Sequence, residues 1–237
     1  MAVRSSALRW LLAIPLASIL LYALLCMGLY LAGTRHLPGR LEPTAWRATP
    51  QLRAQLLQAE AGTAPQDTIP RLDPLTFVPR VVLDIRRQHP GTSSGGHRLL
   101  TSTARMLYFD RGMHAQGRSH HLAEIALQIR ISREWTTEQV ADTLLAESFY
   151  GRCSTGVEQA ARAYFGLPLA QLRQQETLAL IALLKGPSWY DLDRNPGRFR
   201  KRYARLAEQL GHHGPDWSAD AALARLMPPA CIGTGRR

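Results

Sequence analysis

Two glutamates lie where their carboxylates could do chemistry beside basic or imidazole groups. Glu124 follows His120 by four residues, so a helix through this segment places both side chains on one face. Glu60 ends a leucine-rich segment, and a run of cations from Arg198 to Arg205 comes late in the chain. A carboxylate can take a proton from an attacking hydroxyl, and cations can stabilise a departing anion. The sequence therefore contains a possible base and several cations. A transfer reaction in which the donor loses an anionic leaving group requires both.

The segment before Glu60 has the start and stop signals of an amphipathic helix. Thr49 and Pro50 form a typical N-cap and first-turn pair, and Gly62 follows the expected end. An apolar face is supplied by Leu52, Leu56 and Leu57. We therefore place Glu60 in the last turn of this helix.

The rest of the chain has helical periodicity. A further helix start is predicted at Asp73-Pro74, with a kink at Pro79, and a Gly/Ser-rich turn is predicted over 91–96. Apolar residues then recur at helical spacing in three segments, namely at Leu122, Ile125 and Ile129, at Val140 and Leu144, and at Phe199, Tyr203, Leu206 and Leu210. No strand pattern of comparable strength is found, so the predicted fold class is mostly α.

The N-terminus contains a long uncharged stretch. No residue from Trp10 to Thr34 is charged, and this length suffices to cross a hydrocarbon core of about 30 Å as a helix. A cleaved signal peptide fits less well, because its apolar region is shorter and ends in an A-x-A-like site that is not found here. Cys26 follows Leu25 rather than a small residue, which disfavours lipid attachment. Arginines flank both ends of the stretch, so charge does not assign an orientation.

Composition limits the domain count and the class of partner. The chain has 237 residues, 46% of them hydrophobic, which is enough for one core. A formal charge of +11 favours an anionic partner, with nucleic acid, acidic headgroups and pyrophosphates all compatible. Cys153 and Cys231 could pair in an oxidising compartment, although we expect both to be unpaired.

The stretch from Thr155 to Pro196 resembles one enzyme family. Gly156 to Gly166 follows the pattern G-hydrophobic-E-x-A-A-x-x-Y-F-G, and Pro187 to Pro196 follows P-S-x-Y-(D/N)-P-x-x-N-P, with an alanine/leucine helix over 177–184 between them. These are motifs of the bacterial peptidoglycan glycosyltransferases, which comprise monofunctional transglycosylases and the corresponding domain of class A penicillin-binding proteins. The resemblance implies a mostly α, lysozyme-like two-lobed domain on a single N-terminal transmembrane helix.

The same resemblance divides the chain and places it in the cell. It implies a transmembrane helix over 10–34, a connector over 35–48, a transglycosylase-like domain over 49–227 and a flexible tail over 228–237. The chain is then expected in the bacterial inner membrane as a single-pass protein, with its domain facing the periplasm. Nucleic acid is disfavoured as a partner for an outward-facing domain.

The family's catalytic motifs are only partly kept. Glu60 corresponds to the base in E-D-x-x-F-x-x-H-x-G, although Ala61 replaces the Asp and neither the Phe nor the His follows in register. A solvated glutamate at a helix end is an equally weighted interpretation. In R-K-x-x-E, Glu124 is kept, while His120 and His121 replace the cations; imidazoles are mostly neutral at pH 7.

The remaining motifs concern substrate contacts. In G-G-S-T-I-T-Q-Q-L-A-K-N the glycines and Arg105 match, while His97 and Arg98 occupy replaced positions and are candidate phosphate ligands or surface residues. In K-x-x-x-L-x-x-Y-x-N no position is kept. The arginine pair of the late helix resembles Arg198 and Arg202, which could equally form a solvated face.

Three functions are compatible with this pattern. The first is a divergent peptidoglycan glycosyltransferase that polymerises a lipid-pyrophosphate-linked disaccharide (lipid II), with Glu60 as base and with Glu124, His120 and His121 assisting the leaving group. The second is an inactive membrane-anchored relative that binds the precursor or a cell-wall synthesis protein. The third, a lysozyme-like hydrolase, lacks an evident second carboxylate.

Cofactors and the shape of the site complete the expectations. No metal site is predicted from His120 and His121, because consecutive residues are expected to point in different directions, and no cofactor is required. A divalent cation such as Mg²⁺ at the pyrophosphate remains an alternative. We expect Glu60 and Glu124 to face a shared groove.

Overall fold

A computed structural model describes residues 3–35, 37–61, 68–79, 95–111 and 120–229. Its longer helices are α1 (Val3–Thr34), α2 (Pro50–Ala61), α4 (Gly95–Asp110), α5 (His120–Glu134), α6 (Thr137–Glu147), α7 (Val157–Phe165), α8 (Gln174–Leu184) and α9 (Pro196–Gln209). Shorter elements are a helix over 74–79, β1 (Phe149–Gly151), β2 (Ser154–Thr155), η1 (Leu169–Gln171), η2 (Pro215–Trp217) and α10 (Ala219–Ala222). The predicted mostly α class is confirmed.

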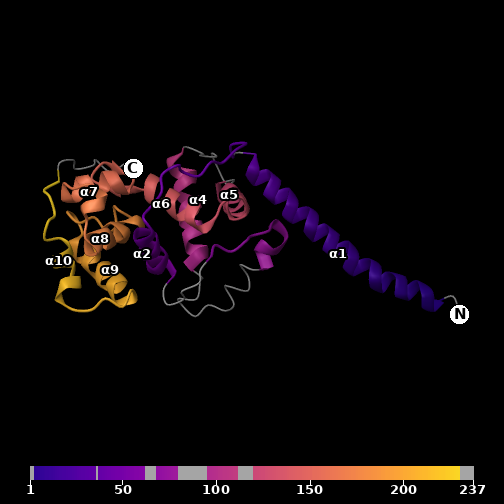
Figure 1. Cartoon of the computed structure of the whole chain (residues 1–237). Coiled ribbons are helices and arrows are strands. Elements are labelled where there is room, and N and C mark those ends of the chain that lie inside the picture. The colour runs from indigo at the N-terminus through magenta and orange to yellow at the C-terminus, as the bar shows by residue number, and fades with distance from the viewer. Residues whose placement is uncertain (1–2, 36, 62–67, 80–94, 112–119, 230–237) are drawn as a thin grey trace.

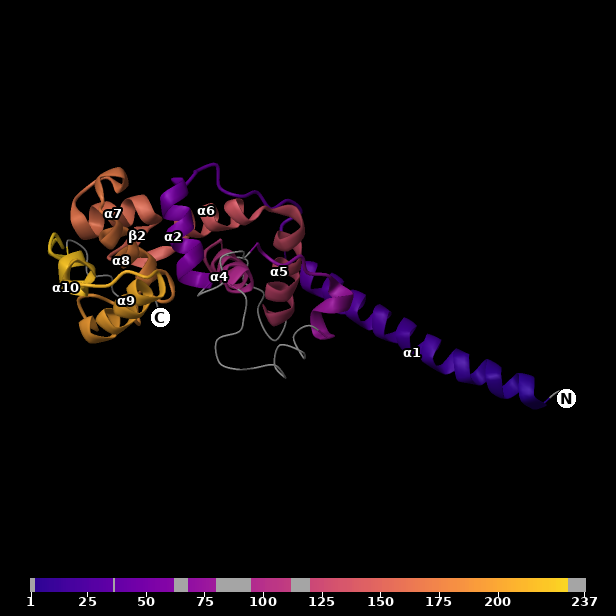
Figure 2. The same cartoon turned by 60° about the horizontal axis from the view of Figure 1, so that its bottom comes forward.

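Helix α2 lies between two groups of helices. It packs against α4 and α6 on one side and against α8 and α9 on the other. Figures 1 and 2 show α4, α5 and α6 together nearer α1, and α7 to α10 together at the far end of the domain. The domain is therefore two-lobed, and the end of α2 lies where the lobes meet.

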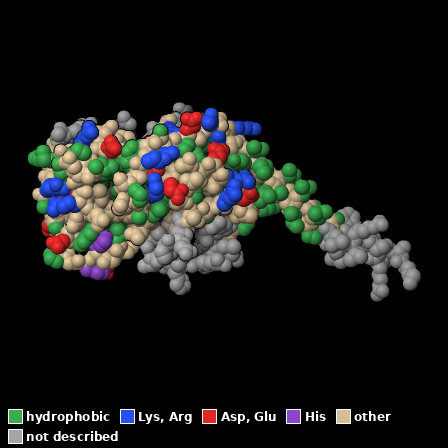
Figure 3. All heavy atoms as spheres, viewed as in Figure 1, with side chains coloured by type: hydrophobic (Ala, Val, Ile, Leu, Met, Phe, Trp, Pro, Cys, Tyr) green, Lys and Arg blue, Asp and Glu red, His purple; other side chains and the backbone are tan. Residues whose placement is uncertain are grey.

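Helix α1 extends away from the domain (Figure 1), and hydrophobic side chains cover much of the part of it that Figure 3 colours. Residues Ala13–Thr34 are long and apolar enough to cross a membrane, with a mean hydropathy of 2.1. At its C-terminal end α1 packs against α5. Gly33 allows this approach, since a Cβ atom there would lie 2.3 Å from the carbonyl oxygen of Leu122. The predicted long apolar helix at the N-terminus is confirmed.

The predicted helix starts agree with the structure. Thr49 caps α2, because its Oγ1 accepts a hydrogen bond from the backbone N–H of Leu52 at 3.3 Å, and Pro50 is the first helical residue. Asp73 caps the helix over 74–79 by accepting from the N–H of Leu75 at 3.0 Å. In α9, Phe199, Tyr203 and Leu206 form the buried face.

Two local predictions were wrong, and one pair of short strands was not predicted. Phe149 to Thr155 forms an antiparallel pair of strands, β1 and β2, which are too short to give a strand pattern in the sequence. Gly95 and Gly96 begin α4 instead of ending a turn, and a Cβ atom on Gly96 would lie 2.4 Å from the carbonyl oxygen of Thr68. Cys153 is disulfide-bonded, whereas we expected a free thiol. Cys231 lies outside the described residues.

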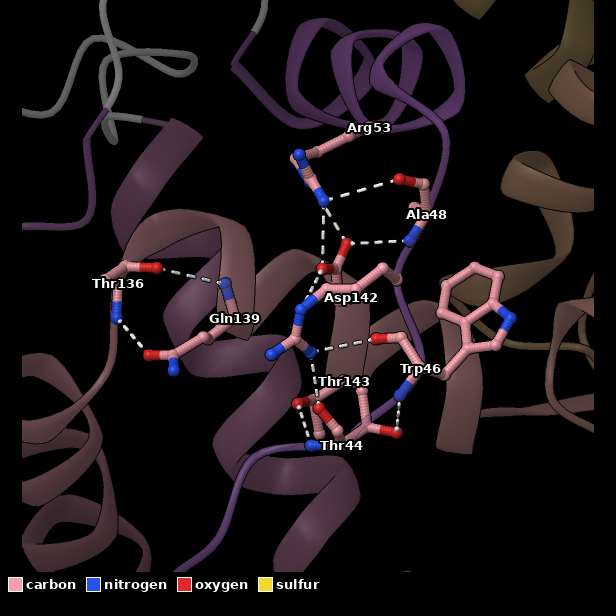
Figure 4. A network of polar contacts seen from close by, with 9 residues as sticks. Thr44, Trp46, Ala48, Arg53, Thr136, Gln139, Asp142 and Thr143 are labelled. Carbon is pink, nitrogen blue, oxygen red and sulfur yellow. Dashed lines mark hydrogen bonds and ion pairs between the residues drawn. The ribbon is translucent and has the colours of Figure 1, made fainter.

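The connector between α1 and α2 is fixed to α6 by polar contacts (Figure 4). The Arg53 guanidinium donates to both carboxylate oxygens of Asp142, at 3.1 and 2.9 Å, and the backbone N–H of Ala48 donates to Asp142 at 3.3 Å. Thr143 accepts from the backbone N–H of Thr44 at 3.1 Å. Asp142 is only 1% exposed, so this pairing compensates a buried charge.

Candidate active site

The C-terminal end of α2 is held by side chains from both lobes. Gln209 of α9 donates through Nε2 to the carbonyl oxygens of Gln58 and Ala59, at 2.8 and 3.2 Å. Arg98 of α4 donates through Nη2 to the carbonyl oxygen of Glu60. These donors satisfy carbonyls that the helix itself leaves unpaired at its end. The backbone of Glu60 is therefore fixed between α4 and α9.

The Glu60 carboxyl is half-buried, and the charges of three cations act on it. Burial raises its pKa above the usual 4.5, and the charges of Arg202, Lys185 and Arg98 oppose this rise without cancelling it. Within the described part of the chain, Glu60 makes no direct ion pair with any of the three. Its oxygens are thus not engaged in an ion pair with these cations.

The cations around Glu60 come from different elements and differ in the contacts that hold their side chains. Arg202 of α9 donates through Nε to the carbonyl oxygen of Ala182 at 2.8 Å, and its guanidinium lies 5.2 Å from the ring centroid of Tyr190. Burial lowers the pKa of Arg202, while the charge of Glu60 raises it. Lys185 caps α8 and is exposed. The Nε of Arg98 is buried without a hydrogen-bond partner.

Arg198, one turn before Arg202 on α9, lies over the exposed ring of Trp189. The Arg198 guanidinium lies 3.7 Å from the ring centroid of Trp189, which is 58% exposed. This arrangement leaves positive charge on the surface beside the partly buried Arg202. A carboxylate with a raised pKa next to such cations suits proton abstraction close to a phosphate-bearing group.

Glu124 does not lie next to Glu60 but on α5, in the lobe nearer α1. It is half-buried on α5, and α4 packs against both α2 and α5. In Figures 1 and 2, α4 lies between α2 and α5. Glu124 is not among the charges that shift the pKa of Glu60. Its assistance to the leaving group stays a prediction.

The two histidines before Glu124 differ from the expectation. The rings of His120 and His121 lie 3.8 Å apart, so the prediction that they point in different directions was wrong. Even so, no group of three or more His, Cys, Asp or Glu residues in the described ranges has a geometry that would hold a metal ion. The expectation of Mg²⁺ at the pyrophosphate stays untested.

The other predicted ligands, His97 and Arg105, lie eight residues apart on α4. His97, in the first turn, is half-buried. Arg105 is exposed, and its guanidinium lies 5.9 Å from the ring centroid of Phe109. Of the α4 candidates, Arg98 is the one whose charge acts on Glu60.

The larger hollow described in the structure lies away from Glu60. It has a volume of about 550 Å³ and is bordered by Gln51, Gln55 and Gln58 of α2, together with Trp46 and Glu158. Glu60 lies two residues beyond Gln58, about 200° further around a helix, and so projects from the other side of α2. A second hollow of about 280 Å³ adjoins β2 and α7. Glu60 and Glu124 line neither of them, so a shared groove stays a prediction.

Two residues around Glu60 and Arg202 were missed by the sequence interpretation. Lys185, whose charge acts on Glu60, is at the end of α8, and Tyr190, which lies against Arg202, belongs to the family-like motif over 187–196. The available signal was a basic residue at the end of a buried helix, directly before a motif rich in turn-forming residues.

Most of the chain is similar to known proteins. A family model described as transglycosylase matches residues 72–211, a range that includes Glu124, Lys185 and Arg202 but not Glu60. A candidate transglycosylase of Cupriavidus necator is 26% identical over 194 residues, which cover 79% of this chain and 82% of that protein. Penicillin-binding protein 1A of Rickettsia typhi is 31% identical over 93 residues, and that of Pseudomonas aeruginosa 29% identical over 92 residues. These matches cover 39% of this chain but only 12% and 11% of the penicillin-binding proteins.

Proposed function

Because this chain belongs to the transglycosylase family, we infer that it extends glycan strands from a lipid-pyrophosphate-linked disaccharide in cell-wall synthesis. The observation that carries this proposal is the position of Glu60 at the end of α2, which Gln209 and Arg98 hold between the two lobes. Burial raises the pKa of its carboxyl, and the charges of Arg202, Lys185 and Arg98 act on it without a direct ion pair. A base of this kind is matched to neutral pH better than an ordinary glutamate. The similarity to penicillin-binding proteins 1A is consistent with the same substrate class.

In the proposed reaction Glu60 accepts the proton of the attacking sugar hydroxyl. The hydroxyl oxygen then bonds to the anomeric carbon of the donor sugar, and the bond from that carbon to the pyrophosphate oxygen breaks. Negative charge develops on the departing pyrophosphate, where Arg202, Lys185 and Arg98 can stabilise it electrostatically. Glu124 would assist departure from the α5 side.

The proposed location is the bacterial inner membrane, with α1 as the single span and the domain in the periplasm. The length and apolarity of α1 support the span. The disulfide at Cys153 supports an oxidising compartment for the domain, because structural disulfides are rare in reducing ones. In this location the site could meet a substrate whose lipid tail stays in the bilayer.

The test is polymerisation of a labelled lipid-linked disaccharide by the purified full-length protein in detergent or liposomes. Replacement Glu60→Gln removes the base with little change in shape, and we expect polymer formation to fall by about 100-fold or more. Glu208→Gln on the exposed side of α9 is the matched control and should retain activity. Equal polymer from Glu60→Gln and the unmodified protein would reject Glu60 as the base.

A second candidate is an inactive relative that binds the lipid-linked precursor or a cell-wall synthesis protein. It is favoured by the family match beginning at residue 72, beyond Glu60, and by the loss of family residues at the substrate-contact motifs. In the same assay it predicts no polymer from the unmodified protein together with retained binding of the precursor. Polymer that depends on Glu60 would exclude it.

A further inference from the structure

The larger hollow lies behind α2, on the side of this helix away from Glu60. Its wall along α2 is formed by Gln51, Gln55 and Gln58. These residues are three or four positions apart, so their side chains share one face of the helix. The volume of about 550 Å³ is within the range of small-molecule sites, about 300 to 1,000 Å³. The hollow is therefore a candidate binding site that the proposed reaction at Glu60 does not use.

The glutamines around this hollow differ in whether the protein already uses their amides. Gln55 is 8% exposed; its Nε2 donates to the carbonyl oxygen of Gln174 at 2.9 Å, and its Oε1 accepts from the Thr177 hydroxyl at 2.6 Å. The side chains of Gln51, Gln58 and Gln174 are on exposed residues and form no hydrogen bond within the ranges that the structure describes. Each free amide can donate and accept. The rim thus offers paired donors and acceptors to a ligand with hydroxyl or amide groups.

An indole ring borders the hollow where the connector passes it. Trp46 is half-buried, and its Nε1 donates a hydrogen bond to Oε1 of Glu158 at 3.0 Å. In Figure 4 the ring lies apart from the polar contacts of Asp142. Trp46 and Glu158 also border the smaller hollow, of about 280 Å³, beside β2 and α7. The two hollows therefore share a positioned aromatic side chain, which suits a ligand longer than one ring.

The charges of the larger hollow are nearly balanced, although the chain has a formal charge of +11. Its described lining contains one arginine, Arg47, one carboxylate, Glu158, and one histidine, His212. Nη1 of Arg47 already donates to the carbonyl oxygens of Thr44 and Trp46, at 2.6 and 3.0 Å. A phosphate group would find no cluster of cations in this lining, so an uncharged ligand fits it better.

Apolar side chains complete the lining, namely Leu52, Leu169, Leu172 and Leu210. A sugar ring has apolar C–H faces and polar edges, so it can pack on an indole or a leucine while its hydroxyls bond to amides. An extended peptide is recognised mainly through hydrogen bonds to the edge of a strand. The strand beside the smaller hollow, β2, has only two residues. The lining therefore favours a carbohydrate over a peptide.

We propose that these hollows bind a neutral carbohydrate chain, with one sugar ring packed on Trp46 and its neighbours hydrogen-bonded by Gln51, Gln58 and Gln174. N-acetylated hexoses match this lining, because they carry hydroxyl and amide groups but no charge. A chain bound behind α2 does not occupy the space at Glu60. The proposal goes beyond the proposed function, and it applies to an active enzyme and to an inactive relative alike.

The test measures the Kd of a neutral, β-1,4-linked N-acetylglucosamine tetramer for the full-length protein by isothermal titration calorimetry. The protein is kept in a detergent without a sugar head group, because such a head group would compete for the site. Trp46→Ala removes the ring, and we expect Kd to rise by about 10-fold. Trp189→Ala removes an exposed ring beside Arg198 and is the matched control, with an unchanged Kd.

A second variant separates binding from folding. Gln51→Ala combined with Gln58→Ala removes two exposed amides that have no partner within the described chain. We expect thermal unfolding to change little while Kd rises several-fold. This variant decides the question if Trp46→Ala does not fold.

Two results would overturn the proposal. The first is failure of the unmodified protein to bind the tetramer, or binding that neither the Trp46 nor the glutamine variant weakens. The second is a larger loss for Trp189→Ala than for Trp46→Ala, which would place the sugar on the Glu60 side of α2. Glu60→Gln should bind the tetramer as the unmodified protein does, so loss of polymerisation with retained binding concerns the proposed function alone.

Discussion

Two glutamates in this chain are surrounded by arginines, with opposite consequences. Glu176, at the start of α8, is fully buried and bound directly by Arg225 and Arg173. Glu60, at the end of α2, is half-buried and is influenced by the charges of Arg202 and Arg98 without a direct ion pair. Direct ion pairs, rather than the number of nearby cations, thus distinguish the structural carboxylate of Glu176 from the unpaired one of Glu60.

The pKa values of the two carboxyls are shifted in opposite directions. Burial pushes the pKa of Glu176 upward, but hydrogen bonds from Arg225, at 2.7 Å from its Nε, and from the backbone and side chain of Arg173 outweigh burial and lower it. For Glu60 burial is the larger influence, and the pKa is raised. Glu176 is therefore stabilised as an anion, whereas Glu60 retains an affinity for protons.

The largest expected effect comes from breaking the Glu176 cluster. Glu176→Gln removes the charge that both arginines bind, and we expect a loss of about 2 to 3 kcal/mol in the free energy of unfolding. The value lies below that for a fully buried pair, because the side chains of Arg173 and Arg225 are 52% and 40% exposed. Denaturant unfolding at pH 7 measures it, with Glu208→Gln as the control.

Acid sharpens this prediction. Because the folded-state pKa of Glu176 lies below the unfolded value, its contribution is present above pH 4.5 and is lost as the pH falls through the lowered pKa. The difference between Glu176→Gln and the unmodified protein should therefore shrink in acid. A difference that stays constant down to the lowest pH at which the protein folds would contradict the role of the charge.

A smaller effect of opposite sign is expected at Glu60. Its folded-state pKa lies above 4.5, so the stability due to its proton is present below that pH and is lost as the pH rises through the raised pKa. Glu60→Gln removes this loss and should make the protein more stable than the unmodified chain at neutral pH, but not in acid. Thermal unfolding across pH measures the crossover. Lower stability of Glu60→Gln at neutral pH would show that the carboxylate is paired in solution.

The smallest effect is expected at the exposed edge of the site. Trp189→Ala removes the ring under Arg198, and the unfolding free energy should fall by about 0.5 to 1 kcal/mol, as for cation–π contacts at exposed positions. Chemical denaturation detects this difference, with Arg198→Lys as a variant that keeps the charge. A loss as large as that of Glu176→Gln would place Trp189 in the structural framework instead of at an open edge.

Much of the helical framework could be predicted from local signals. The N-cap at Thr49, the start at Asp73-Pro74 and the buried face of α9 follow from capping chemistry and apolar spacing, which depend on neighbours in sequence. The same signals failed for β1 and β2, because strands of three and two residues have too few positions to show alternation.

The candidate site was less predictable, because its members come from distant segments. Glu60, Arg98 and Arg202 were proposed one by one, but only the packing of α2 against α4 and α9 brings their charges together. Lys185 was missed for the same reason. The pairing of Cys153 depends on a long-range approach that spacing does not encode.

The contacts of Asp142 with Arg53 and Ala48 have a mechanical consequence. They attach the end of the connector and the start of α2 to α6, while α1 packs on α5, so α1 and α2 are both attached to the lobe that contains α5 and α6. If α1 spans a bilayer, as proposed, these contacts set the distance of Glu60 from the membrane surface.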